Sequence, residues 1–149
     1  MKRLATEYWV PLLVWLIVIF FFSTDSFAAN KTAGLIYSLL RFIAPNLPQA
    51  DLEFWHGVIR KCGHMSEYFI LAIFTHRSLR EDQPDLTGIK LRTMCFALLA
   101  AAFDEYHQSL TLFRTASPVD VGYDCLGAVW ALWLITTNET RRLRTHSFL

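Results

Sequence analysis

Residues able to do acid–base and anion-binding chemistry gather in three short stretches of the sequence. These stretches are KCGHMSE from Lys61, FDEYHQS from Phe103 and PVDVGYD from Pro118, and Arg114 lies between the last two. Histidine changes its charge near neutral pH and can serve as a general acid or base. Arginine and lysine hold phosphate oxygens and stabilise developing negative charge. The combination indicates a site that moves a proton beside a bound anion.

Each stretch spaces its polar residues as they would lie on one flank of a helix. Side chains three or four residues apart are neighbours on a helix surface. This spacing occurs at positions 61, 64 and 67, at 104, 105 and 108, and at 120, 124 and 127. Because position 127 is a glycine, a neighbouring helix is expected to approach closely there, at the floor of a cavity.

The composition of the 149-residue chain indicates where these helices lie. Hydrophobic residues make up 54% of the sequence and charged residues 18%, which is typical of a membrane protein. A net charge of +1 provides no extended basic surface, so we expect no nucleic-acid partner. The cysteines at positions 62, 95 and 125 are odd in number and lack metal-ligand spacing, and we expect ordinary buried thiols.

Four apolar segments approach the length of about 20 residues that crosses a bilayer. They cover residues 8–22, 56–76, 91–110 and 118–136. The segment from Thr32 to Pro45 has apolar residues at helical intervals and is expected to lie along the membrane surface. The sequence therefore predicts one all-α domain over residues 1–149, with four transmembrane helices and one interfacial helix. A removable signal peptide is the alternative for the first segment.

The distribution of lysine and arginine predicts the orientation of the spans. With both termini in the cytoplasm, nine basic residues fall on the cytoplasmic side: Lys2, Arg3, Arg77, Arg80, Lys90, Arg92, Arg141, Arg142 and Arg144. Five fall on the outer side: Lys31, Arg41, Arg60, Lys61 and Arg114. In this orientation all three polar stretches lie at the outer ends of their helices.

The meeting of three polar stretches at one depth favours a functional pocket over a structural network. An ionisable side chain at the bilayer centre costs about 2.5–3.5 kcal/mol, so such groups need partners or water. In the structural interpretation, Lys61 reaches the interface by itself, and the acids pair with Lys61 or Arg114 only to satisfy charge. That interpretation explains one stretch more easily than three.

The three stretches also resemble the VanZ-like family of small bacterial membrane proteins. The family pattern is Lys-x-x-His-x-x-x-Tyr, then Asp-Glu-x-x-Gln, an Arg, and Ser-x-x-Asp-x-x-x-Asn/Asp-x-x-Gly. The matching residues are Lys61, His64, Glu67, Tyr68, Asp104, Glu105, Gln108, Arg114, Ser117, Asp120, Asp124 and Gly127. Two positions depart from the pattern. Asp124 stands where asparagine is frequent, and Thr111 to Phe113 stand where Pro-Gly commonly precedes the arginine.

The resemblance implies a multi-pass protein of the bacterial inner (plasma) membrane. Founding members of the family are associated with resistance to the glycopeptide antibiotic teicoplanin. A distant similarity has been proposed to membrane enzymes that exchange or hydrolyse phosphate-containing lipid head groups. The expected partner is therefore a membrane lipid or a lipid-linked envelope precursor, and the expected activity is that of a head-group phosphotransferase or phosphodiesterase.

Roles can be assigned to the matched residues on this basis. His64 would be the general base or acid, oriented by Glu67, and Arg114 would clamp phosphate oxygens. The other residues of the catalytic set are Asp104, Glu105 and Gln108, which would position the attacking group, and Asp120, which would hold Arg114 or a metal. The substrate-binding set is Lys61, Tyr68, Ser117 and Asp124. A divalent cation on the carboxylate oxygens is an open alternative.

Two further functions remain open on the sequence. A non-enzymatic envelope factor could use the same pocket to bind and shield a lipid-linked precursor or the antibiotic. A proton-coupled transporter would also use acids within the membrane, but the cytoplasmic halves of the spans offer it no polar path. The sequence does not fix the oligomeric state.

Overall fold

The structure, a computed structural model, describes residues 2–80, 85–114 and 116–146, with side chains described over 6–80, 85–114 and 116–139. Five α-helices and one 3-10 helix account for the secondary structure of these residues, which confirms the predicted all-α fold. The helices are α1 (Lys2–Phe22), η1 (Asp25–Phe27), α2 (Ala29–Ile43), α3 (Gln49–Arg80), α4 (Leu86–Ser109) and α5 (Pro118–His146).

Local sequence signals explain where the helices begin. The Asp85 carboxylate accepts a hydrogen bond from the Thr87 amide at 3.1 Å and caps the first turn of α4. Ser117 does the same for α5, since its hydroxyl accepts from the Val119 amide at 3.2 Å. Pro118 follows at the first helical position, where a missing amide hydrogen costs nothing. The Ser117 cap lies where the loop that carries Arg114 enters α5.

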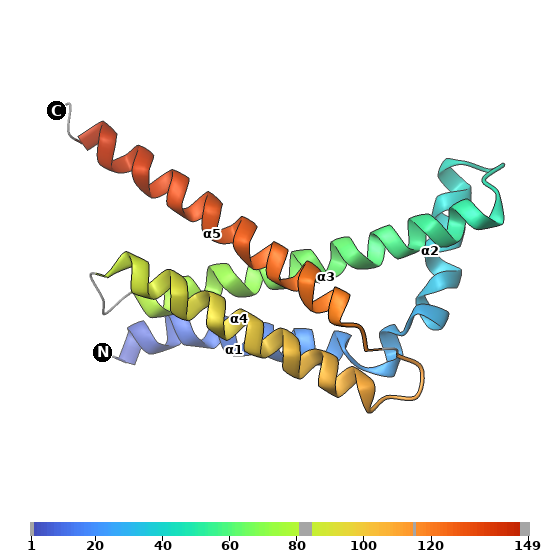
Figure 1. Ribbon diagram of the computed structural model, residues 1–149, viewed down its shortest axis with the longest axis horizontal. Coiled ribbons are helices and arrows are strands. Elements are labelled where there is room, and N and C mark those ends of the chain that lie inside the picture. The colour runs from blue at the N-terminus through green and yellow to red at the C-terminus, as the bar shows by residue number, and fades with distance from the viewer. Residues whose placement is uncertain (1, 81–84, 115, 147–149) are drawn as a thin grey trace.

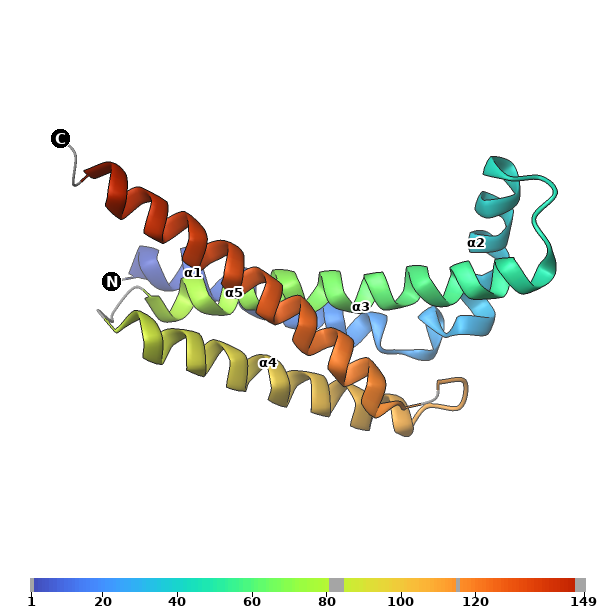
Figure 2. The ribbon, with the colours of Figure 1, turned by 45° about the horizontal axis from the view of Figure 1, so that its top comes forward.

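Helix α3 is the central element of the bundle. It packs against α1, α4 and α5 along its second half, and its first half extends beyond them to meet α2 (Figure 1). Helix α2 crosses this extension at a steep angle (Figure 2). The beginning of α1 and the end of α5 lie at one end of the bundle, whereas η1, α2 and the loop before α5 lie at the other. The polar stretches therefore lie together at the end of the bundle formed by α1, α3, α4 and α5, from which the first half of α3 extends (Figure 1).

Small residues let the helices of the core approach one another. Alanines from three helices form much of the buried core: Ala72 on α3, Ala97 and Ala101 on α4, and Ala128 and Ala131 on α5. The closest approach is at Gly127, where an added Cβ would lie 2.1 Å from the backbone oxygen of Met65. The predicted close contact at Gly127 is thus present, and it joins α5 to α3.

The prediction of four transmembrane helices is supported only in part. By length and composition, α4 and α5 could each cross a membrane, and residues 6–43 qualify as a third span only if α1, η1 and α2 are counted together despite a 65° bend. Helix α3 has ample length, but its described charges include Arg60, Lys61 and Glu67 near its middle. The polar residues that form the candidate site therefore also make α3 the least apolar of the predicted spans.

The expectation of buried thiols is wrong for two of the three cysteines. Cys62 and Cys95 are exposed, and Cys125 is partly buried. Their helices turn these positions away from the neighbouring helices. A thiol is apolar enough to suit a lipid-facing surface as well as a core, so composition alone could not distinguish the two.

Candidate functional site

Two adjoining cavities occupy the end of the bundle where the polar stretches meet. The first has a volume of about 210 Å³, and its polar lining comes from Ser23, Thr32, Arg60, His64, Glu67, Asp104, Gln108 and Arg114. The second has a volume of about 320 Å³ and is lined by Ala29, Gly57, Arg60, Lys61, His64, Phe113, Ser117 and Asp120. Arg60 and His64 line both cavities, so they form the wall between them. Either cavity exceeds the roughly 30 Å³ that one water molecule occupies in the liquid.

His64 is held against a buried carboxylate from α5. Its Nδ1 lies 3.2 Å from Oδ1 of Asp124, whose side chain is fully buried. The Gly127–Met65 contact one turn further along brings the two helices close enough for this pairing. A carboxylate at one ring nitrogen orients a histidine and leaves the other nitrogen for chemistry. Asp124 is thus the acid beside Nδ1 of His64, whereas Glu67 lines the first cavity with it, and the orienting role of Glu67 stays a prediction.

Gln108 connects an acid to an arginine through its amide group. The amide nitrogen donates to Oδ2 of Asp104 at 2.8 Å, and the amide oxygen accepts from Nη1 of Arg114 at 3.3 Å. Asp104 and Gln108 lie one turn apart on α4 and are both buried. A glutamine suits this place because its side chain carries both a donor and an acceptor. The Asp-Glu-x-x-Gln motif thus serves to position Arg114.

The guanidinium of Arg114 reaches from the loop toward the end of α1. Its Nη2 donates to the backbone oxygen of Phe22, the last residue of that helix. Burial lowers the pKa of Arg114 from its usual value, and the positive charge of Arg60 lowers it further. An anion bound between these two arginines would favour their charged forms.

Glu105 and Asp25 anchor the loop that carries Arg114. Oε2 of Glu105 accepts a hydrogen bond from the Ser117 amide at 2.6 Å, and Oδ1 of Asp25 accepts from the Phe113 amide at 3.1 Å. Each bond ties the loop to a different helix end, α4 in one case and η1 in the other. Glu105 was predicted to position the attacking group, and in the structure its visible contact is with the loop backbone.

The remaining predicted residues lie at different distances from the first cavity. Lys61 is exposed and places its ammonium 4.9 Å from the centre of the Tyr123 ring, on the side of the second cavity. Asp120 also lines the second cavity, and among the described residues it forms no ion pair with Arg114. Tyr68 on α3 is fully buried, and it lines an apolar groove between α1 and α4. The structure thus brings the predicted residues to one end of the bundle but divides them between adjoining spaces.

Arg60 is the cation that the sequence interpretation missed. It was counted on the outer side, whereas Lys61 was assigned to the site from its helical spacing to His64 and from its match to the family pattern. Helical spacing could have found it, since positions 60, 64 and 67 share one face of α3. Ser23 and Thr32 also line the first cavity, and neither of them was assigned to the site from the sequence.

The structure gives no support to a metal centre in the part of the chain it describes. Within those residues no three histidine, cysteine, aspartate or glutamate side chains form a group that could hold a metal ion. Three acids of the site are instead paired with protein groups: Asp124 with His64, Asp104 with Gln108, and Glu105 with the Ser117 amide.

Comparison with known proteins identifies a family over most of the chain. A family model described as VanZ/LLP1 matches residues 8–139. No curated protein and no solved structure matches the chain. The match confirms the resemblance seen in the three polar stretches, and it extends over α1, α2 and the described part of α5 as well.

Proposed function

Because the chain belongs to the VanZ/LLP1 family, we propose that it acts on the phosphate-containing head groups of cell-envelope lipids or lipid-linked precursors. The observation that carries the proposal is the arrangement of the first cavity, where His64, paired with Asp124, faces the same space as Arg60 and Arg114. A base and two cations around one cavity suit transfer of a phosphoryl group.

The proposed reaction uses each of these groups once. The free ring nitrogen of His64 takes the proton of an attacking hydroxyl, whose oxygen forms a bond to phosphorus while the bond to the leaving alcohol breaks. The proton then passes to the leaving oxygen. Arg114 and Arg60 stabilise the charge on the other phosphoryl oxygens. With an alcohol as acceptor the protein is a phosphotransferase, and with water it is a phosphodiesterase.

Asp124 keeps the histidine in the required tautomer. It can accept the Nδ1 proton, so that the opposite nitrogen is free to act as a base. An asparagine, which is frequent at this position in the family, also offers a side-chain oxygen to that proton. The departure at Asp124 is therefore compatible with the same role.

The test of this function is the loss of a product when His64 is replaced. We expect purified protein, incubated with an envelope lipid extract in mild detergent, to form a new head-group species that mass spectrometry detects. His64→Ala should form it about 10²–10⁴ times more slowly, the usual range for loss of a general base. His76→Ala is the matched control, because His76 lies on the same helix as His64 and is not among the residues lining either cavity. Equal product from wild type and His64→Ala would contradict the proposal.

We further propose that the site faces outward from a bacterial inner membrane crossed by α1, α3, α4 and α5, with both termini in the cytoplasm. The packing of α3 against α4 and α5, the two helices that could each cross a membrane by length and composition, supports a membrane-crossing α3 (Figure 1). Helix α3 contains 32 residues, about 48 Å of helix, and so exceeds a hydrocarbon core of about 30 Å. Its first half can therefore stand in the outer head-group layer beside α2.

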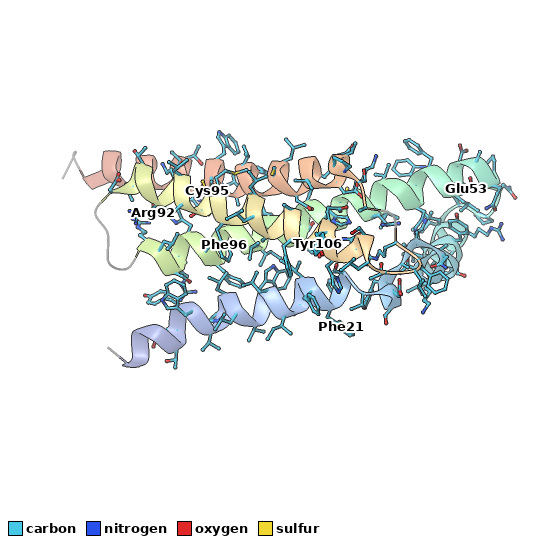
Figure 3. All side chains as sticks on the ribbon, turned by 60° about the horizontal axis from the view of Figure 1, so that its bottom comes forward. Phe21, Glu53, Arg92, Cys95, Phe96 and Tyr106 are labelled. Carbon is cyan, nitrogen blue, oxygen red and sulfur yellow. The ribbon has the colours of Figure 1, made fainter. Side chains whose placement is uncertain are left out.

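Cysteine labelling tests this orientation. In a variant without native cysteines, Glu53→Cys should react with a membrane-impermeant maleimide added to intact spheroplasts, whereas Arg92→Cys should react only after the membrane is opened. Both positions are exposed, and they lie toward opposite ends of the molecule (Figure 3). The reverse labelling pattern would place the site in the cytoplasm.

A further inference from the structure

An apolar groove lies between α1 and α4 and leads to the polar site. Its volume is about 690 Å³. Helix α1 lines it with Leu13, Leu16, Ile17, Ile19 and Phe20, and α4 lines it with Phe96, Leu99, Ala100 and Phe103. Phe96 lies on the side of α4 that faces α1 (Figure 3). The groove exists because α1 packs chiefly on α3 and does not close against α4.

The end of the groove near Phe20 and Phe103 adjoins the first cavity. Asp104 lines both spaces, so the apolar groove and the polar site meet at this residue. Tyr68 also lines the groove, and its buried hydroxyl has no hydrogen-bond partner among the described residues. One ligand that extends from the cavity into the groove would be polar at one end and apolar at the other.

We propose that the groove holds an acyl chain of the lipid whose phosphate head group occupies the first cavity. This proposal rests on the proposed function, because it concerns the same substrate. It assigns the apolar part of substrate recognition to α1 and α4, and the polar part to the loop and α3.

The depth of the groove fits a lipid in one leaflet. On α1 it runs from Leu13 to Phe20, seven residue steps or about 10 Å along the helix. The hydrocarbon of one leaflet is about 15 Å thick, half of the bilayer core. The groove therefore follows the outer half of α1 and ends at the level of the polar site, where the chain of an outer-leaflet lipid joins its head group.

A photoreactive amino acid in the groove tests the proposal. We would place p-benzoylphenylalanine at Ile17, or at Val14 as the control, since Val14 is also exposed on α1 but is not among the groove residues. The protein is irradiated in vesicles that contain phosphatidylethanolamine, phosphatidylglycerol and diacylglycerol, and mass spectrometry identifies the adducts. Diacylglycerol has the acyl chains without the phosphate, so it distinguishes head-group capture from ordinary lipid contact.

The expected result is a preference for phosphate lipids at Ile17 alone. Adducts of the two phospholipids should exceed diacylglycerol about tenfold relative to the vesicle composition, equivalent to about 1.4 kcal/mol. At Val14 the adducts should follow the composition. Ala100→Phe, which fills the groove, should abolish the preference, whereas Ala102→Phe, at an exposed position that does not line it, should not.

Other outcomes separate this inference from the proposed function. Equal adduct ratios at Ile17 and Val14 would overturn the groove proposal even if the protein turns lipid over. A preference at Ile17 without any turnover would support the groove and contradict catalysis. An adduct with a second copy of the chain at Ile17 would identify that copy as the occupant and overturn the proposal.

Discussion

Replacing Arg114 with alanine is expected to lower product formation about 100- to 1,000-fold, the usual cost of removing one preorganised donor from a transition state. Arg114 is held at two points, by the Gln108 amide oxygen and by the Phe22 carbonyl, so its guanidinium is fixed in the wall of the first cavity before substrate arrives. The effect would be measured as the single-turnover rate at which each variant forms the head-group product that mass spectrometry detects.

Two further substitutions make the Arg114 experiment specific. Lys61→Ala is the matched control, since Lys61 is exposed and rests on the Tyr123 ring rather than in the first cavity. It should lower the rate much less than Arg60→Ala, because Arg60 lines that cavity. Arg114→Lys distinguishes catalysis from shielding of a bound precursor: a planar clamp loses most of its effect with lysine, and a loose binding site loses little. Unchanged turnover in Arg114→Ala would contradict the proposed role.

Gly127→Ala is expected to destabilise the fold by about 1–3 kcal/mol, in the range of overpacked cores. The added methyl group would lie 2.1 Å from the Met65 backbone oxygen, and a backbone atom cannot swing aside as a side chain can. Helices α3 and α5 would have to separate, and His64 and Asp124 would separate with them. Thermal unfolding in detergent, followed by loss of helical circular dichroism, would measure the change.

Gly122→Ala is the matched control for this prediction. Gly122 lies on α5 as well, but an added Cβ there meets nothing within 4 Å. Alanine also favours a helix over glycine by about 1 kcal/mol, so this variant should be at least as stable as the wild type. If both variants unfold at the same temperature, α3 and α5 do not meet at Gly127 as the structure shows.

The location of the site could be predicted from the sequence because polar residues are rare in apolar helices. The clusters around His64, Asp104 and Asp124 each interrupt an apolar run, and the basic residues of the loops oriented all three toward one end. The all-α fold and the close approach at Gly127 followed from the same patterns. These features depend on periodicity and composition along one helix at a time.

The pairing within the site could not be predicted, because it depends on how the helices rotate against one another. Spacing allowed Glu67 to orient His64 from the same helix, whereas the structure supplies Asp124 from α5. In the same way Lys61 fitted the family pattern, but α3 turns Arg60 toward the first cavity. The prediction of four spans counted α3 as one of them. The charged residues that α3 contributes to the site lower its hydropathy, so length and composition alone do not identify it as a span.

The Gln108 amide has one more consequence for the way the site behaves. A hydrogen bond between arginine and a carboxylate weakens when the acid takes up a proton and loses its charge. Gln108 carries no charge and does not titrate, yet it holds Arg114 by a carbonyl oxygen, as does Phe22. Both groups that hold the cation are therefore uncharged oxygens, whereas the carboxylate of Asp104 is bonded to the Gln108 amide nitrogen rather than to Arg114.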